Sequence, residues 1–171
     1  KVFFFVNAEI QADETPSPFD FGVYDGNSDQ AKLTELSQFV QNTYGYDPGT
    51  FGDISDELNG LKLFAKIDIN LNDDHRLTLR HNYTQAENIN RNVSNASNIN
   101  FSRNGVFFPS LTNSSALELN SRFGNDLSNN LIIGFTNVSD DRDPIGTDFP
   151  YVFINDGNGQ IAMGSEQFST G

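Results

Sequence analysis

Apolar and polar residues alternate along several stretches of the chain, and this pattern constrains the fold more than any other feature. From Leu61 to Leu71, aliphatic residues occupy every second position, and mostly polar residues fill the positions between them. Such alternation places apolar side chains on one face of a β-strand and polar side chains on the other. The stretch exceeds the usual globular strand of about five or six residues. A turn sequence, Asn72–His75, follows, and Arg76–Thr84 alternates again, which predicts a long hairpin.

The same alternation predicts five strands, at about residues 1–11, 61–71, 76–85, 115–123 and 131–139. Short connections, at about 72–75 and 124–130, alternate with long loops, at about 12–60, 86–114 and 140–171. All long loops would therefore leave one end of the sheet. Short turns at one end and long loops at the other are typical of an outer-membrane barrel, and the strand lengths match a tilted membrane strand. We expect an all-β fold: an antiparallel up-and-down transmembrane β-barrel segment of about five strands with long extracellular loops.

Alternation also assigns the two faces of such a sheet. The residues expected to face lipid are Val2, Phe4, Val6, Leu63, Ile67, Ile69, Leu77, Leu79, Leu119 and Ile133. The residues expected to face the barrel lumen are Lys62, Lys66, Asp68, Arg80, Glu118 and Arg122. A soluble antiparallel sheet with one face on a core and one in water would alternate in the same way, so this alternative stays open.

The first long loop carries a helical signal. Leu33, Leu36 and Val40 recur at helical spacing, with Gly45 as a stop. Ser28 is the expected N-cap, and Asp29 suits the positive end of a helix. We therefore predict one short helix over about residues 29–43. Its apolar stripe would pack on the aromatic residues of the same loop, namely Phe19, Phe21, Tyr24 and Tyr46.

Composition restricts the partners and the chemistry. The net charge of −13, with a pI near 4.2, argues against nucleic acid or an anionic membrane surface as partner, since both require basic patches. Cysteine is absent, which excludes thiolate zinc sites, disulfides and thiol catalysis. No apolar stretch approaches the roughly 20 residues that a membrane-spanning helix needs.

Several motifs suggest chemistry without supplying a complete site. Asp156–Ile161 resembles the middle of a calcium loop, but Ile154 and Ser165 occupy positions where carboxylates should lie, and a tight turn explains the same residues. Asp140, Asp141, Asp143 and Asp148 crowd one loop, which could equally be a solvated turn region. The two histidines, His75 and His81, are not spaced as metal ligands. We therefore expect no enzyme, no metal and no cofactor.

Four phrases of the sequence together resemble TonB-dependent outer-membrane receptors, in particular the Oar-like group common in Bacteroidetes. The phrases are KVFFFVNAEIQADETP, LKLFAKIDINLNDDHRLTLRHNYT, NSSALELNSRFGNDLSNNLIIGFTNVSDDRDP and FPYVFI. The resemblance implies a barrel of about 22 strands with a plug, of which this chain would be a barrel segment lacking the plug. It also implies location in the outer membrane, with the long loops outside the cell.

The expected partners follow from this resemblance: outer-membrane lipid, the remaining barrel strands and plug, and the TonB energy-coupling complex through segments outside this chain. The receptor would import an extracellular nutrient of unknown identity. We expect the first long loop to bind it through Phe19, Phe21, Tyr24, Tyr44 and Tyr46, although these aromatic residues could instead pack the loop's own core. The alternative function is a soluble or surface-displayed β-rich binding module without transport activity.

Overall fold

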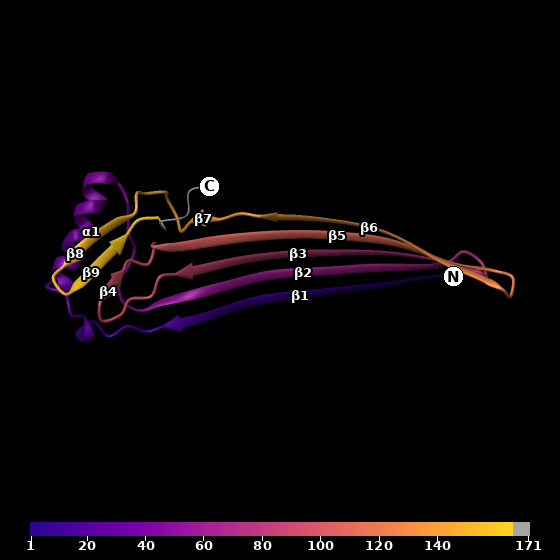
Figure 1. Cartoon of the computed structure of the whole chain (residues 1–171), viewed down its shortest axis with the longest axis horizontal. Helices are drawn as coiled ribbons and strands as arrows, with labels where there is room; N and C mark the ends of the chain where they lie inside the picture. The colour runs from indigo at the N-terminus through magenta and orange to yellow at the C-terminus, as the bar shows by residue number, and fades with distance from the viewer. Residues whose placement is uncertain (166–171) are drawn as a thin grey trace. The chain divides into compact units, whose positions relative to one another are not determined.

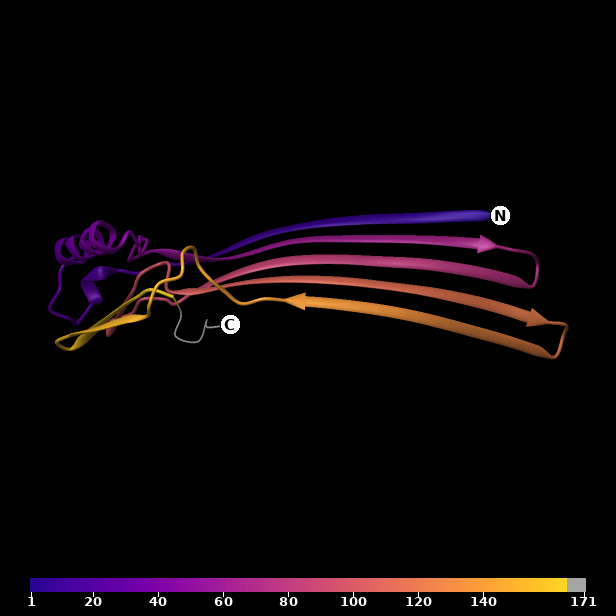
Figure 2. The same cartoon turned by 90° about the horizontal axis from the view of Figure 1, so that it is seen from above.

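The alternating stretches form one antiparallel sheet. The computed structural model describes residues 1–165. Its main sheet has the order β1-β2-β3-β5-β6, with the short β7 paired to β5. Figures 1 and 2 show the long strands side by side, with consecutive strands running in opposite directions. The bounds are Val2–Ser17 (β1), Ile54–Asn70 (β2), His75–Arg91 (β3), Gly105–Phe123 (β5), Leu127–Asp140 (β6) and Asp143–Pro144 (β7).

The chain divides into two compact units. The first comprises Lys1–Ala12, Asn59–Ala86 and Pro109–Asp140, and the second comprises Asp13–Leu58, Glu87–Phe108 and Asp141–Gly171. The division falls within β1, β2, β3 and β5, so both units contain parts of these strands.

The predicted hairpin of the first unit is confirmed. Strands β2 and β3 are neighbours in the sheet, and the backbone N–H of Leu71 donates to the carbonyl of His75 at 3.0 Å. The side-chain oxygen of Asn72 accepts hydrogen bonds from the backbone of Asp74 and His75, at 2.9 and 2.8 Å. A short polar side chain that bonds to the backbone two residues on is a common way to close a turn. The turn chemistry in the sequence therefore produces the hairpin.

The strands are longer than alternation indicates. The structure carries β1 on to Ser17 and begins β5 at Gly105, inside segments that we predicted to be loops. The turn predicted over 124–130 is also shorter, because Phe123 already pairs with Leu127 around Gly124, whose φ is 66°. In these end regions the strict alternation of apolar and polar residues disappears, while the backbone remains in a strand. The segment Ser110–Ser115, for example, pairs with β6 residue by residue.

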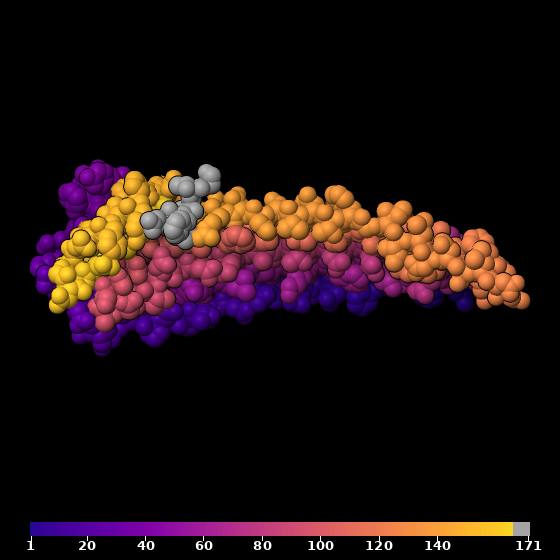
Figure 3. Space-filling model, in the orientation of Figure 1, coloured from indigo at the N-terminus to yellow at the C-terminus, as the bar shows by residue number. Residues whose placement is uncertain are grey.

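Several large apolar side chains of the first unit are exposed, and some polar side chains on the opposite face are enclosed. On β2, Ile67 is 41% exposed, whereas the side chain of Asp68 is only 14% exposed. Thr78, on β3, is 6% exposed. Every residue of the edge strand β6 is exposed, and Figure 3 shows this strand in orange along the margin of the first unit. A soluble sheet usually shows the reverse, with its apolar face buried.

The polar face is held together by ion pairs and hydrogen bonds. Asp68 accepts from the Thr78 hydroxyl at 2.6 Å, and its carboxylate lies 3.0 Å from the side-chain nitrogens of both Lys66 and Arg76. Lys62 pairs with Glu9 of β1 at 2.7 Å. Neighbouring strands are therefore linked by charged side chains on this face.

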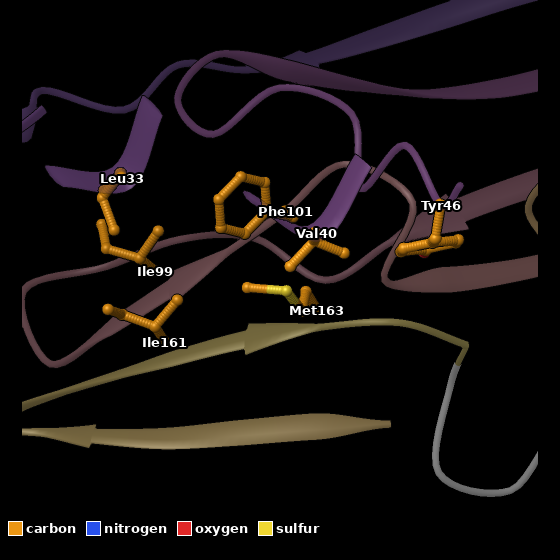
Figure 4. Packing of buried hydrophobic residues seen from close by; sticks show 7 residues of the cluster. All are labelled: Leu33, Val40, Tyr46, Ile99, Phe101, Ile161 and Met163. Atoms are coloured by element: carbon orange, nitrogen blue, oxygen red, sulfur yellow. The ribbon is translucent and has the colours of Figure 1, made fainter. Parts of the chain in front are cut away.

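The second unit has a core of its own, between one helix and a small sheet. Helix α1 (Gln30–Tyr44) contributes Leu33 and Val40. Figure 4 shows these side chains meeting the buried residues of the facing segments. The other buried members of the cluster are Tyr46, Ile99, Phe101, Ile161 and Met163. This cluster is the largest buried apolar group that the described residues form.

The helix lies where its apolar spacing predicted it, but its N-cap differs by one residue. Asp29 is the N-cap, and its carboxylate accepts from the backbone N–H of Lys32 at 2.9 Å. Ser28, the expected cap, instead donates its hydroxyl to Asp156 at 3.0 Å. Gly45 ends the helix in the left-handed conformation, with φ of 69°, as expected from its position. A short 3-10 helix, η1 (Phe21–Val23), precedes α1.

Three short strands occupy segments that we predicted to be loops. They are β4 (Asn98–Asn100), β8 (Val152–Asp156) and β9 (Gly159–Met163), in the order β4-β9-β8. The tight turn predicted between the last two is confirmed, since Asp156 pairs with Gly159. β4 joins β9 in parallel, which departs from an all-antiparallel arrangement. The described residues thus contain nine strands rather than about five, because the long loops fold into a structured unit.

Neither helix in the described part of the chain has the length and apolar character needed to cross a membrane.

Candidate binding surface

Four of the five predicted ligand contacts, all but Tyr44, pack in the core of the second unit. The rings of Phe19 and Phe21 lie 6.3 Å apart, and Phe21 contacts Tyr24 at 5.6 Å between ring centroids. All three rings pack against the buried cluster around Phe101, which is fully buried. Their main environment is the core of this unit, as the alternative interpretation of the loop allowed.

The hydroxyl of Tyr24 has a specific partner. It donates to the carboxylate of Asp156 at 3.0 Å, and the same carboxylate accepts from the backbone N–H of Ser28 at 2.9 Å and from its hydroxyl at 3.0 Å. Burial raises the pKa of Tyr24 above its usual value, and the hydrogen bond to Asp156 and the negative charge of that residue raise it further. This cluster fastens the β8–β9 hairpin to the segment before α1, which is a structural role.

Asp156 itself stays ionised to lower pH than usual. Burial alone would raise its pKa, but the backbone N–H of Ser28 and the hydroxyls of Tyr24 and Ser28, with the nearby charge of Lys32, outweigh burial and lower it. All of its hydrogen bonds go to the surrounding protein groups. The calcium-loop interpretation of Asp156–Ile161 is therefore not supported by the role of its first residue.

Tyr46 is the most buried of the five residues, at 3% exposure. Its ring stacks on that of Phe149, with centroids 4.1 Å apart and planes 8° from parallel. Burial raises the pKa of Tyr46; the charge of Arg103 opposes this shift, and the carboxylates of Asp47 and Asp148 add to it. The phenol of Tyr46 thus lies close to two acidic side chains.

Tyr44 is the one predicted contact that lies largely on the surface, at 64% exposure. Its ring makes an edge-to-face contact with the exposed ring of Phe39 at 6.1 Å and lies 6.1 Å from that of Phe149. We call Phe39, Tyr44 and Phe149 the ring cluster. Sequence analysis missed Phe39, although its place next to Val40, off the apolar stripe of the helix, is the signal that could have identified it.

A second pair of exposed rings, Tyr151 and Phe153, lies at the start of β8, Tyr151 directly before its first residue. Tyr151 and Phe153 alternate with Val152 and Ile154, which pack against the core of the second unit. The two exposed rings lie 6.4 Å apart with planes 24° from parallel. Sequence analysis missed this pair too, since the run is apolar on both faces.

Two hollows lie in the first unit. One, of about 720 Å³, is at the hairpin turns and is polar, with five asparagines in its lining and the ion pair of Arg122 with Asp74 at 2.9 Å. The other, of about 420 Å³, lies among Ile67, Leu79 and Phe135, and contains the contact of His81 with Ser115 at 2.8 Å.

The described residues contain no group of three or more acidic, histidine or cysteine side chains arranged to hold a metal ion. In the aspartate-rich loop, Asp140 accepts from the Ser110 hydroxyl at 2.6 Å and Asp148 accepts from that of Ser165 at 2.8 Å. The carboxylates of this loop thus bond to separate neighbours. His75 packs on Phe123, while His81 lies on another part of β3.

Charge divides unequally between the two units. The segments of the second unit hold 16 of the 23 acidic residues and 4 of the 10 basic residues, which gives them a net charge of −12. The segments of the first unit carry the remaining −1. The exposed rings of the ring cluster therefore lie in the strongly acidic unit.

Comparison of the chain with models of protein families, with curated proteins and with solved structures finds no match.

Proposed function

We propose that this chain is a segment of a TonB-dependent outer-membrane transporter, which binds an extracellular nutrient and imports it with energy coupled from the inner membrane. In this proposal the sheet of the first unit forms part of the barrel wall. The second unit, built from the long connections, lies outside the cell and takes part in binding. Lipid, the remaining strands and plug, and the TonB complex are its partners.

One observation carries the proposal: large apolar side chains of the first unit such as Ile67 are exposed, while Asp68 and Thr78 on the opposite face are largely enclosed. Exposing the apolar side chain of Ile67 costs free energy in water but not in hydrocarbon. Contact with lipid would therefore remove this cost. Asp68, Lys66 and Arg76 satisfy one another on the opposite face, which suits a polar lumen.

The strand lengths and the sheet edges support the same proposal. Strands β1, β2, β3, β5 and β6 each have 14 to 19 residues, long enough to cross a bilayer at a tilt and extend beyond it. β1 and β6 end the order of the main sheet. Long open edges favour aggregation unless they are paired. Further strands of a barrel would pair with both.

The resemblance of four phrases to TonB-dependent receptors supplies the transport part of the proposal. Nothing in the arrangement of the first unit performs transport by itself, because import belongs to the whole barrel with its plug. The resemblance is therefore an argument for the class of protein, while the distribution of apolar and charged residues is an argument for a membrane wall.

A second function has one observation in its favour. The second unit has its own buried core, between α1 and the β4-β9-β8 sheet. A unit with its own core could act as a β-rich binding module, displayed at the surface without transport.

Membrane fractionation of cells that express the protein with its natural flanking sequence tests the proposal. We expect the protein in the outer-membrane fraction, resistant to carbonate extraction, with electrophoretic mobility that changes on boiling as folded barrels show. Recovery as a monodisperse soluble protein without detergent would contradict the proposal and favour the binding module.

A further inference from the structure

We propose that the ring cluster of Phe39, Tyr44 and Phe149 is a docking surface for a cationic polypeptide segment, which binds through lysine or arginine side chains. The inference rests on the proposed function in that it names the class of ligand that the second unit would receive. It adds a residue set and a ligand charge that neither the sequence pattern nor the family resemblance supplies.

The ring cluster has the geometry of a surface that receives a side chain. Phe39 and Tyr44 lie on α1 and at its end, and both are exposed although each ring is large and apolar. Their rings meet edge to face at 6.1 Å, and the ring of Phe149 contacts that of Tyr44 at 6.1 Å between centroids. Phe149 is itself fixed by its stack on the buried Tyr46. Rigid aromatic anchors of this kind are enriched where proteins bind partners.

The charges next to the rings determine which partner fits. Glu35 is exposed on α1 one turn before Phe39, and residues four apart on a helix are neighbours. Asp148 precedes Phe149 in the chain and is exposed. An ammonium or guanidinium group that approaches the ring cluster would meet ring faces and carboxylates together, and both attract cations.

Two of the four basic residues of the second unit, Arg103 and Lys32, are already engaged or lie at the far end of α1. Arg103 pairs with Asp47 at 3.3 Å. Lys32, the only basic residue of α1, lies in its first turn, whereas Tyr44 is its last residue. The charge of Arg103 is therefore offset by Asp47, and Lys32 lies at the opposite end of α1 from Tyr44.

The charge of the whole unit acts in the same direction. With a net charge of −12, the segments of the second unit would repel an anionic ligand and attract a cationic one over distance. A neutral glycan could stack on the rings but would gain nothing from this charge. A polypeptide that carries several basic residues uses both features, and we take it as the occupant.

Binding of labelled hexalysine to the protein, purified in a neutral detergent, tests the inference. Hexaglutamate with the same label and maltohexaose are the comparison probes. We expect hexalysine to bind, more weakly as salt is added, and the other two probes to show no binding. Replacing both surface rings, in F39A/Y44A, should weaken hexalysine binding about 5- to 10-fold, since each exposed cation–ring contact contributes modestly.

Matched controls separate this surface from general attraction to an acidic protein. Y151A/F153A removes the other exposed ring pair, and D25N removes one charge before the start of α1, a helix of about 22 Å. Both controls should bind hexalysine like the unchanged protein. E35Q should weaken binding without removing a ring, and it serves as the second variant should circular dichroism show that F39A/Y44A is misfolded.

The inference would be overturned if F39A/Y44A and Y151A/F153A lost hexalysine binding equally. It would also be overturned if the folded F39A/Y44A and E35Q both bound hexalysine like the unchanged protein. Ring-dependent binding of maltohexaose in place of hexalysine would also overturn it and would indicate a glycan surface. The binding assay does not depend on where the protein fractionates. A soluble protein that binds hexalysine through these rings would contradict the proposed function and leave this inference standing.

Discussion

From the contact of Tyr24 with Asp156 we predict how the stability of the protein changes at alkaline pH. In the folded protein the pKa of Tyr24 is raised above its usual value of 10.0, first by burial and then by Asp156. Folding therefore favours the neutral phenol, and its contribution to stability is complete below about pH 10 and is lost as pH rises further. We predict that Y24F loses less stability than the unchanged protein between neutral pH and pH 11, as measured by thermal unfolding.

The matched control for this prediction is Y151F, which removes a phenol that does not bond to Asp156. Its alkaline loss of stability should equal that of the unchanged protein. Y24F should also be less stable at neutral pH, because Asp156 loses one of its donors. An alkaline loss in Y24F as large as in the unchanged protein would contradict the role given to this hydroxyl.

The candidate surface shows what residue patterns can and cannot predict. Aromatic residues in a polar loop predicted a cluster of rings, and Tyr44 is on the surface. Tyr46 is buried because Phe149, distant in sequence, stacks on it, and no local pattern encodes that contact. The sequence likewise identified Ser28 as the cap, whereas the remote Asp156 engages its hydroxyl.

At the level of elements, the residue that ends α1 allows the cost of one backbone conformation to be measured separately. Gly45 has φ of 69°, and a side chain placed there would meet no atom within 4 Å. A larger residue here would therefore be destabilised only by the left-handed backbone conformation, and not by a steric clash. We predict that G45A lowers the free energy of unfolding of the second unit by about 1 kcal/mol, measured by amide hydrogen exchange of the core residues.

The comparison variant for G45A is G45N, because asparagine tolerates the left-handed region better than alanine does. G45N should lose less stability than G45A. If the two variants were equally stable, the helix end would have rearranged and the assigned cap would be wrong.

A substitution on β2 tests whether this face of the sheet lies in a membrane. An arginine in place of Ile67 would put a charge in lipid if this position lies near the midplane, at a cost of about 2 to 4 kcal/mol. The measurement is the stability of I67R refolded into lipid vesicles, with I67L as the control that keeps the apolar contact. A near-neutral I67R would contradict the placement of this face in lipid.

Elements with strong alternation were predictable, and those without it were not. In β2 and β3 the period of two and the Asx turn at Asn72 agree, so the hairpin follows from local sequence. β4 has a single apolar residue, Ile99, between asparagines, and it forms a strand only by pairing in parallel with β9. Long-range pairing of that kind leaves no periodic signal in the sequence.

For the whole molecule, the contrast between the units is the main result. The segments of the first unit are nearly neutral, and their sheet exposes an apolar face, while those of the second carry almost all of the net charge around a separate core. The proposed membrane wall and aqueous binding unit would account for this contrast together. A single soluble domain would have no reason to expose Ile67 and enclose Asp68.

The absence of cysteine allows this central claim to be measured directly. Single-cysteine variants at successive positions of β2 from Lys62 to Ile69, in the protein reconstituted into vesicles, can each carry a fluorescent label. We predict a period of two: labels at 63, 65, 67 and 69 are quenched by brominated lipid, and labels at 62, 64, 66 and 68 by an aqueous quencher. Aqueous quenching at every position, with no effect of brominated lipid, would contradict the account.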